Sequence, residues 1–510
     1  MSLLGVDVGT TGCKACAFRE DGRLLASAYR EYDIVRKKPG EAELNAQEVW
    51  ENVKEVIQST AAACVHDPVS ALAVSSLGEA VVPVSQDRAI LGNSILNFDE
   101  RGAEYVPQFT RVCPPDRLYR INGNTPGNHY TLTKLLWLRD HQPDLYERTY
   151  KFLHWAGFVS FMLGADPVVD YSLANRTLLF DLEQKTWSNE LFDIAGLDVE
   201  KLPPTVPSGT LIGEVSPKIA AELGLGNKPV AVVSGAHDQC ANALGCGVVE
   251  EGSAMFGMGT YFCIAPVYHS RPEPAKMLPY GLNTEHHAAP NCFVTFLYNH
   301  GGSLLKWFRE TFAHDAQSLA SQTGVNVYDL LMREVSSQPS SVLVLPHFAP
   351  TGPPEFVADS SGVILGLKLE TPSGDIMRGI MEGVVFYLRE CVDAAAAAGI
   401  QIHELRAVGG GSKSDAWLQI AADILNCPLV RMEVPEAGAL GSAILAGSAT
   451  GIFVSAPDGS RAMTRKGHPF EPNPSLVEFY RTRYDQYRQI WPLLKPLLHE
   501  LHRTIHETSD

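Results

Sequence analysis

The sequence predicts an α/β protein built from two similar domains that face each other across a cleft. The first observation is length: 510 residues are too many for one hydrophobic core, so two domains are expected. The second is a pattern that both halves share, in which a buried strand ends in a glycine- or aspartate-containing turn and continues into a hairpin or a helix. It occurs at residues 3–18, 229–247 and 404–425. Glycine lets a backbone approach a ligand closely, which indicates a ligand between the two domains.

The first half alternates strands and helices. Apolar runs predict strands at 3–9, 14–20, 22–34 and 69–78, the first two joined as a hairpin by a glycine/threonine turn. A helix is predicted from Asn45, which can cap it, with Glu48 in the capping-box position. Its buried stripe is expected to consist of Val49, Val53, Val56, Ile57 and Ala61. Residues 131–147 give a further helical region, interrupted at Pro143.

The second half continues this alternation. Strand-like runs at 252–265, 292–299 and 340–348 are expected to belong to a second sheet. A helix is predicted over 374–398, with Gly399 placed to end it. No low-complexity linker marks a hinge, so the hinge at 245–255 and the division into domains 1–246 and 247–510 are inferred from the pattern alone.

Charge and composition exclude several classes of function. The formal net charge of −17 disfavours nucleic acid or an acidic membrane as a partner, because both would repel the chain at long range. No run of about 18 apolar residues occurs, so no membrane span is expected, and the N-terminus does not resemble a signal peptide. Hydrophobic residues make up 45% of the chain, which is typical of a soluble globular protein. A cytoplasmic protein is expected.

The ten cysteines are expected to be buried, reduced thiols. The one CxxC pair, Cys13 and Cys16, falls in a predicted strand, where residues three apart point to opposite faces. The sequence contains neither an HExxH motif nor a paired Cys/His spacing, so a zinc site is not expected. The histidine pair in EHH, residues 285–287, is expected to lie in a solvated loop.

The turn after the first strand has the residues of a phosphate-binding loop. In DVGTTGCK, residues 7–14, backbone amides and the hydroxyls of Thr10 and Thr11 can reach phosphate oxygens. Lys14 adds a positive charge, and Asp7 at the strand end can hold Mg²⁺ through water. The chain has no GxxxxGK[ST] motif, so this is not a Walker loop. A plain hairpin with a glycine turn is the alternative interpretation.

A second polar turn carries the candidate base. In SGAHDQ, residues 234–239, Asp238 follows a buried strand and could accept a proton from a substrate hydroxyl. The alternative is a helix cap, and one carboxylate can serve both roles. Two more glycine turns, at 257–261 and 408–417, are weak signals alone. So is the small-residue helix at 435–447, for which close helix packing is the alternative.

Together these stretches resemble the FGGY carbohydrate kinases over nearly the whole chain. DVGTTGCK is similar to the family's first phosphate motif, and GAHDQ to its catalytic turn. TLTKLLWLRDH, with Lys134 and Trp137, resembles one family signature, and residues 362–382 resemble the other except at Gly379. GGGSKSDAWLQIAADIL and GALGSAILAG are similar to the adenosine-binding stretch and the helix behind it.

The resemblance implies two ribonuclease-H-like domains of the actin and hexokinase superfamily, flanking an interdomain catalytic cleft for MgATP and a sugar. Asp238 would be the general base for a hydroxyl that attacks the γ-phosphate, and Asp7 would lie near the metal. The implied nucleotide ligands are Thr10, Thr11, Lys14, Gly259 and Thr260 for the phosphates, and Gly410, Gly411 and Ser412 for the adenosine. Phosphoryl transfer depends on alignment and charge neutralisation, which agrees with these residue types.

The resemblance also implies the substrate contacts, which would be Gly78, Glu79, Asp99, Asp238 and Gln239. Glu79 stands where xylulokinases carry histidine; glycerol kinases also carry glutamate there, usually after an arginine where this chain has Gly78. A carboxylate accepts hydrogen bonds from hydroxyls, which suits any polyol or ketose. D-xylulose is therefore the leading substrate, with glycerol, erythritol or another polyol, ribulose and gluconate as alternatives. A solvated turn residue is the alternative for Glu79.

Two other classes of function compete with a sugar kinase. A non-catalytic nucleotide-binding chaperone or filament protein would use the same actin-like domains, but the sequence shows neither a peptide-binding domain nor a polymerising surface. A degenerate kinase that senses sugar is disfavoured because Asp7, Lys14 and Asp238 are all present. The expected partners are a small sugar and ATP, and a homodimer is left open.

Overall fold

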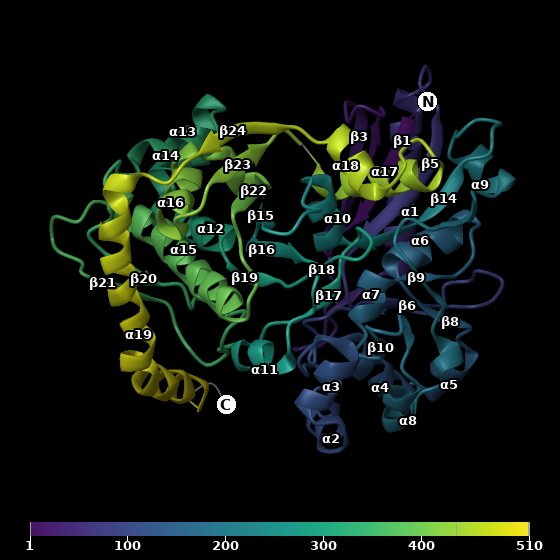
Figure 1. Ribbon diagram of the computed structural model, residues 1–510, viewed down its shortest axis with the longest axis horizontal. Helices are drawn as coiled ribbons and strands as arrows, with labels where there is room; N and C mark the ends of the chain where they lie inside the picture. The colour runs from purple at the N-terminus through teal and green to yellow at the C-terminus, as the bar shows by residue number, and fades with distance from the viewer. Residues whose placement is uncertain (1, 435, 508–510) are drawn as a thin grey trace.

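The computed structural model describes residues 2–434 and 436–507. These residues form two α/β bodies, each built around its own sheet (Figure 1). The first half of the chain supplies a sheet of six strands, and the second half supplies a sheet of eight. The predicted pair of α/β domains is therefore confirmed.

The first sheet places its functional turns at one edge. It consists of β1 (Ser2–Val8), β2 (Gly12–Phe18), β3 (Leu24–Glu31), β5 (Val69–Ser76), β13 (Leu211–Glu214) and β14 (Ala231–His237), in the order β13-β14-β5-β1-β2-β3. β1, β5 and β14 run parallel, so their carboxyl ends meet. β1 and β2 form the predicted hairpin, whose register pairs Asp7 with Lys14. Asp7, the turn after β5 and Asp238 are therefore neighbours.

Two helices cover one face of this sheet. α1 (Ala46–Ala63) and α6 (Trp155–Leu163) share a hydrophobic core with β1 and β5. Asn45 caps α1 as predicted, its Oδ1 accepting a hydrogen bond from the Glu48 backbone N–H at 3.3 Å. The predicted stripe of α1 is buried throughout, which fixes this helix against the strands.

The opposite face is covered by α10 (Asp238–Gly245) and by α17 (Ala437–Ala449) from the far end of the chain. Figure 1 shows α17 and α18 (Ala456–Met463) in yellow-green beside the first sheet. The close packing expected of this small-residue helix is confirmed, because a Cβ on Gly5 would lie 1.7 Å from the Ala439 carbonyl oxygen. Pro435, the first residue of the predicted helix, lies outside the described residues. The domain boundary at 246/247 stays a prediction. The structure shows in addition that the chain returns to the first sheet through α17.

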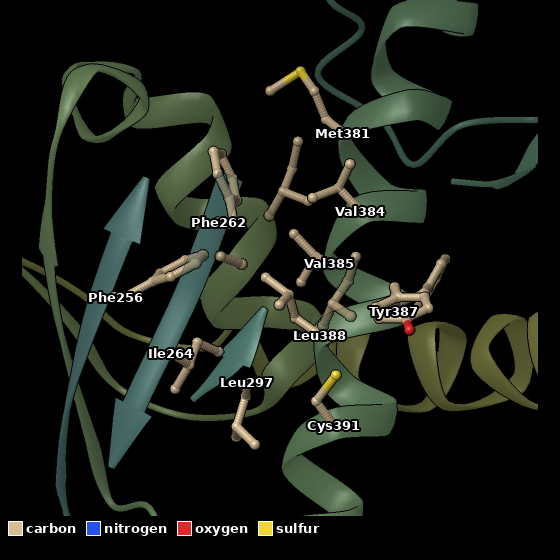
Figure 2. Packing of buried hydrophobic residues seen from close by; sticks show 14 of the residues in the cluster. Phe256, Phe262, Ile264, Leu297, Met381, Val384, Val385, Tyr387, Leu388 and Cys391 are labelled. Atoms are coloured by element: carbon tan, nitrogen blue, oxygen red, sulfur yellow. The ribbon is translucent and has the colours of Figure 1, made fainter. Parts of the chain in front are cut away.

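The second sheet packs on a long helix. Its strands are β15 (Ser253–Met258), β16 (Tyr261–Tyr268), β17 (Glu285–His286), β18 (Phe293–Val294), β19 (Leu297–His300), β22 (Glu404–Val408), β23 (Leu429–Met432) and β24 (Lys466–Phe470), in the order β17-β18-β16-β15-β22-β23-β24 with β19 beside β16. Figure 2 shows Val384, Val385 and Leu388 of α15 (Ser373–Ala397) facing Phe262 and Ile264 of β16. Gly399, the residue predicted to end this helix, has φ +97°.

One predicted strand lies elsewhere. β20 (Leu343–Leu345) pairs with β21 (Val363–Leu365) in a separate two-stranded sheet, so the expectation that residues 340–348 belong to the second sheet is wrong. An apolar run specifies burial but not the pairing partner. Here the run packs on α15, where a Cβ on Gly383 would lie 2.4 Å from the Val344 carbonyl oxygen.

The remaining elements lie around the two sheets. The helices are α2 (Tyr105–Val112), α3 (Pro115–Asn122), α4 (Thr131–His141), α5 (Pro143–Arg148), α7 (Tyr171–Asn175), α8 (Asn189–Ala195), α9 (Pro217–Glu222), α11 (Pro274–Met277), α12 (Gly302–Phe312), α13 (His314–Thr323), α14 (Val327–Glu334), α16 (Asp415–Leu425) and α19 (Pro474–Glu507). Short strands are β4 (Glu43–Leu44), β6 (Val81–Val84), β7 (Ser94–Ile95), β8 (Lys151–His154), β9 (Val169–Asp170), β10 (Phe180–Asp181), β11 (Thr186–Trp187) and β12 (Thr205–Val206). α4 and α5 confirm the predicted interruption at Pro143. Among the described helices, none combines the length and the apolar character that crossing a bilayer requires.

The cysteine prediction is confirmed and the histidine prediction is not. All ten cysteines are buried free thiols, and Cys13 and Cys16 contribute to the cores on opposite faces of the first sheet. The EHH sequence at 285–287 lies in and directly after β17 and is buried, so the expectation of a solvated loop is wrong. The burial has a structural reason: the His286 ring Nε2 lies 2.8 Å from the Leu182 carbonyl oxygen, which ties β17 to the first domain.

Candidate active site

The edge of the first sheet and the glycine turns of the second sheet border one cleft. Its cavity has a volume of about 250 Å³. Asp7, Lys14 and Gln239 line it from the first domain, and Gly257, Gly259 and Gly409 line it from the second. The start of α17 completes the lining. The glycine turns that the sequence singled out in the two halves therefore surround the same cavity.

Asp238 stands beside this cleft as the first residue of α10, while His237 occupies the N-cap position. Asp238 is therefore an acidic first-turn residue, which a helix N-terminus favours, rather than the cap itself. Burial raises the pKa of Asp238 to about 7, and the negative charges of Asp7 and Glu79 add to the shift, while hydrogen bonds from Gln239 oppose it. A carboxyl group with a pKa near neutrality is matched to accepting a hydroxyl proton.

His237 lies beside this carboxylate. Its Nε2 lies 3.2 Å from Asp238 Oδ1. Burial and the nearby Arg176 hold the pKa of His237 well below its usual value, so the ring is neutral. The buried Nδ1 has no partner among the residues that the structure describes. In the sequence, nothing distinguishes His237 from an ordinary turn histidine.

The predicted phosphate loop lies at the tip of the β1–β2 hairpin. Thr10 and Thr11 occupy the turn, which is closed by a hydrogen bond from the Gly9 N–H to the Gly12 carbonyl oxygen at 2.9 Å. Lys14 Nζ lies 2.6 Å from Glu436 Oε2, at the start of α17. Lys14, which was predicted to contact phosphate, is thus paired with a carboxylate on the cleft wall. Glu436 was missed by sequence reasoning because it belongs to no phosphate motif.

Asp7, the predicted metal residue, is fixed by a hydrogen bond at the end of β1. Ser75 Oγ donates to Asp7 Oδ1 at 2.7 Å, and burial raises the pKa of Asp7 while Ser75 and Lys14 lower it. Asp7 and Glu436 both line the cleft. Mg²⁺ commonly takes one or two carboxylates and completes its shell with water and phosphate, so this donor set fits it. No group of three His, Cys, Asp or Glu side chains suited to a metal occurs in the described ranges 2–434 and 436–507.

The predicted nucleotide residues of the second domain follow lining residues of the cleft. Thr260 lies in the β15–β16 turn directly after Gly259. Gly410, Gly411 and Ser412 begin a 3₁₀ turn directly after Gly409. Gly409 has φ +92° and its Cβ would lie 3.0 Å from the Met258 carbonyl oxygen, so only glycine suits this wall.

Glu79 is not a solvated turn residue; it is 3% exposed. Its Oε1 accepts hydrogen bonds from Nε and Nη2 of Arg176, the first at 2.8 Å. Arg176 Nη1 donates to Glu285 Oε1. Neither Arg176 nor Glu285 was singled out from the sequence, since they lie outside every motif. The small size of Gly78 lets the turn approach His237, because a Cβ there would lie 3.1 Å from His237 Nε2.

Asp99 lies apart from these residues, in the protein interior at 1% exposure. Its Oδ1 accepts hydrogen bonds from the backbone and the Nε of Arg101, and its Oδ2 accepts from Arg101 Nη2 and the Ala42 backbone N–H at 2.6 Å each. Lys134 donates to the carbonyl oxygens of Asp99 and Arg101. Because every carboxylate oxygen is already engaged, the geometry favours a structural role and gives no support to the predicted substrate contact.

A second cavity, of about 330 Å³, lies between α15, α19 and the loop before β21. It carries carboxylates from Glu355, Glu390 and Asp393 and aromatic side chains such as Trp491. None of the residues predicted to bind phosphate or base lines it. The smaller cleft is therefore the candidate active site.

Two α/β bodies that enclose a predicted phosphate loop, with an aspartate of pKa near 7 beside it, have the architecture that a phosphotransferase requires. Family models match both halves of the chain: the FGGY family of carbohydrate kinases, N-terminal domain, at residues 2–245, and C-terminal domain, at residues 254–450. The chain therefore belongs to the FGGY family of carbohydrate kinases, and it is an ATP-dependent carbohydrate kinase. This confirms the predicted family, the actin/hexokinase-like fold and the class of enzyme.

Relatives of known name extend over nearly the whole chain. A xylulose kinase of Bacillus subtilis (strain 168) is 28% identical over 506 residues, 97% of this chain and 97% of its own. A gluconokinase of Bacillus licheniformis is 28% identical over 464 residues, 88% of each chain. The crystal structure of a xylulose kinase from Rhodospirillum rubrum superposes with a TM-score of 0.85 at 25% identity, covering 98% of this chain and 100% of that one.

Proposed function

We propose that this kinase transfers the γ-phosphoryl group of ATP to a hydroxyl of a ketopentose, D-xylulose first among the candidates. The observation that carries the mechanism is the carboxylate of Asp238, which lies beside His237 and the cleft with a pKa of about 7. It would accept the proton as the substrate hydroxyl attacks phosphorus. The sugar itself is suggested by the xylulose kinases among the relatives, which are 28% and 25% identical to this chain. Gluconate is the second candidate, because a gluconokinase is also 28% identical.

The phosphates would lie between the two walls of the cleft. Thr10, Thr11 and Lys14 would contact them from the hairpin, and Gly259 with Thr260 from the facing turn. Gly410, Gly411 and Ser412 would contact the adenosine. Asp7 would hold Mg²⁺, which when bound offsets the negative charge of the phosphates. Glu79 and Gln239 would contact the sugar. Closure of the two domains around both substrates would exclude water and so prevent ATP hydrolysis.

Two further features of the protein are proposals. The ten buried free thiols fit a reducing compartment, so we place the kinase in the cytoplasm. A homodimer is proposed as its assembly, to be checked by light scattering of the purified chain.

The test of the proposed activity is sugar-dependent ADP release in a coupled assay. D-xylulose, D-ribulose, glycerol, erythritol and D-gluconate would each be supplied with MgATP. The expected result is the highest kcat/KM with D-xylulose. If another of these compounds is preferred, the kinase stands and the substrate is reassigned. If none raises ADP release above the rate without sugar, the proposed function is wrong.

The raised pKa of Asp238 gives an expected pH dependence. A general base must be deprotonated, so kcat/KM should rise with pH through a midpoint near 7, the pKa of the free enzyme. Glu79→Gln removes one of the negative charges that raise this pKa, so the midpoint should move to lower pH. Both are measured as kcat/KM profiles over roughly pH 5 to 9. A flat wild-type profile across this range would contradict the role of Asp238.

The ion pair between Lys14 and Glu436 should weaken ATP binding. Both side chains are about a third exposed, at 28% and 34%, and the phosphates must compete with Glu436 for the ammonium group. Glu436→Gln is expected to lower KM for ATP by about two- to fivefold, the size of a partly exposed ion pair. Glu433→Gln, which removes the same charge from an exposed position nearby, should leave KM unchanged. A higher KM in Glu436→Gln would instead assign Glu436 to the metal.

A further inference from the structure

Glu285 comes from the second sheet but pairs with Arg176 of the first domain, close to Gly78 and His237. β17 lies against α7 of the first domain, and the backbone N–H of His286 donates to Asn175 Oδ1 at 3.2 Å. Arg176 directly follows α7, which brings its guanidinium between Glu285 and Glu79. The side chains of Glu79, Arg176 and Glu285 are 4%, 12% and 0% exposed. This buried group of three charges is called the carboxylate–arginine relay below.

On each side of the relay, one carboxylate oxygen has no hydrogen-bond partner among the described residues. Glu79 Oε1 takes both hydrogen bonds from Arg176, so Glu79 Oε2 remains available to a substrate hydroxyl. Glu285 Oε1 is shared by Arg176 and Asn283. Glu285 Oε2 is buried and has no partner in the part of the chain that the structure describes. A buried carboxylate oxygen without a donor is costly, which indicates that this second negative charge is retained for a purpose other than stability.

The charges of the relay do not add up to an anion receptor. Arg176 contributes one positive charge, which burial disfavours but Glu285 and Glu79 together stabilise, so the pKa of Arg176 lies well above its usual value. The two glutamates outnumber it, and the carboxyl group of Asp238 is close enough for Glu79 to raise its pKa. The histidine beside it, His237, is neutral. Burial raises the pKa of Glu285, and the adjacent Arg176 opposes that shift. Where an arginine alone would attract a carboxylate substrate, here Glu79 and Glu285 offset the guanidinium charge.

We propose that Glu285 is a positioning and specificity-determining residue of the sugar site. It holds Arg176 so that Arg176 orients Glu79, and it cancels the guanidinium charge so that the site takes an uncharged ketose or polyol and rejects an aldonate anion. The inference rests on the proposed sugar kinase activity and narrows its substrate class. Sequence identity to the relatives does not distinguish a ketose from gluconate as the substrate, whereas the charges of this site favour the uncharged ketose.

The test compares D-xylulose with D-xylonate, the anion of a five-carbon aldonic acid of similar size. The wild-type enzyme is expected to have a kcat/KM for D-xylulose at least about tenfold above that for D-xylonate, since like charges in a partly desolvated site repel strongly. Glu285→Gln keeps an acceptor for Arg176 but removes the charge. It should reduce this ratio by about fivefold or more, with little change in KM for D-xylulose.

Glu285→Asp separates charge from position. The charge stays but the shorter side chain withdraws from Arg176, so the ratio should be kept while KM for D-xylulose rises severalfold and kcat changes less. The matched control is Glu382→Gln, which alters a buried pair with Arg378 remote from the cleft. It is expected to lower the melting temperature without changing the ratio.

Three results would overturn the inference. The first is a wild-type enzyme that uses D-xylonate or D-gluconate as well as any ketose or polyol, a measurement that needs no variant to fold. The second is a ratio unaffected by Glu285→Gln in a protein with a cooperative melting transition. The third is an equal loss of selectivity in Glu382→Gln. In all three the kinase itself stands, whereas an enzyme that phosphorylates none of these compounds contradicts the proposed function.

Discussion

Replacing Asp238 by asparagine is expected to lower kcat by at least about a hundredfold, because removing a general base typically costs that much or more. The amide keeps the size of the side chain and can still contact His237, whose Nε2 lies 3.2 Å from the carboxylate. ATP affinity should therefore be unchanged. The measurement is steady-state turnover with D-xylulose, together with ATP binding by calorimetry.

The same substitution should stabilise the fold above neutral pH. The pKa of Asp238 is raised in the folded protein to about 7 from an ordinary value of 3.8. A carboxyl group of this kind favours the fold while protonated and costs stability as the pH rises through the folded pKa. Asp238→Asn removes that cost, so its melting temperature should exceed that of the wild type at about pH 8 by a few degrees. A decrease in kcat of only a few-fold would contradict the assignment of the base.

Replacing Gly5 by alanine is expected to give the largest loss of stability. The added methyl group would lie 1.7 Å from the Ala439 carbonyl oxygen and 2.6 Å from its carbonyl carbon. Backbone atoms cannot turn aside as a flexible side chain can, so α17 must shift away from β1. We expect a loss of about 3 kcal/mol and a melting temperature lower by several degrees.

This substitution should also reduce activity, because Glu436, the N-cap of α17, lines the cleft and Gly438 of α17 lies next to Asp7. The control is Gly92→Ala, where the added carbon would meet only side-chain atoms of Leu145 and Pro83 at 3.4 Å, an ordinary contact. Equal melting temperatures for the two variants would show that α17 does not pack on β1 as described.

The elements that carry local signals could be predicted from the sequence. The β1–β2 hairpin follows from its Gly/Thr turn, and the start of α1 follows from the cap at Asn45. Asp238 and Lys14 are recognisable because a polar residue after a buried strand stands out against the apolar run. In each case the signal and the structure it specifies are close together in the chain.

Contacts between distant segments could not be predicted in this way. Arg176 and Glu285 are 109 residues apart, and neither has neighbours that distinguish it from a surface charge. The return of α17 to the first sheet depends on Gly5 and Ala439 meeting, which no local pattern specifies. The burial of the EHH sequence could not be predicted for the same reason. Its polar residues favour exposure to solvent, but distant partners, Arg176 for Glu285 and Leu182 for His286, allow the burial of these side chains.

The measurement that tests the central claim most directly follows the radiolabelled γ-phosphoryl group of ATP in the presence of D-xylulose. The expected result is label on the sugar at the rate of ADP formation in the wild-type enzyme, and nearly none on the sugar in Asp238→Asn. Label that appears only in inorganic phosphate, or that reaches the sugar equally fast without the Asp238 carboxylate, would contradict the assignment of this cleft and this base.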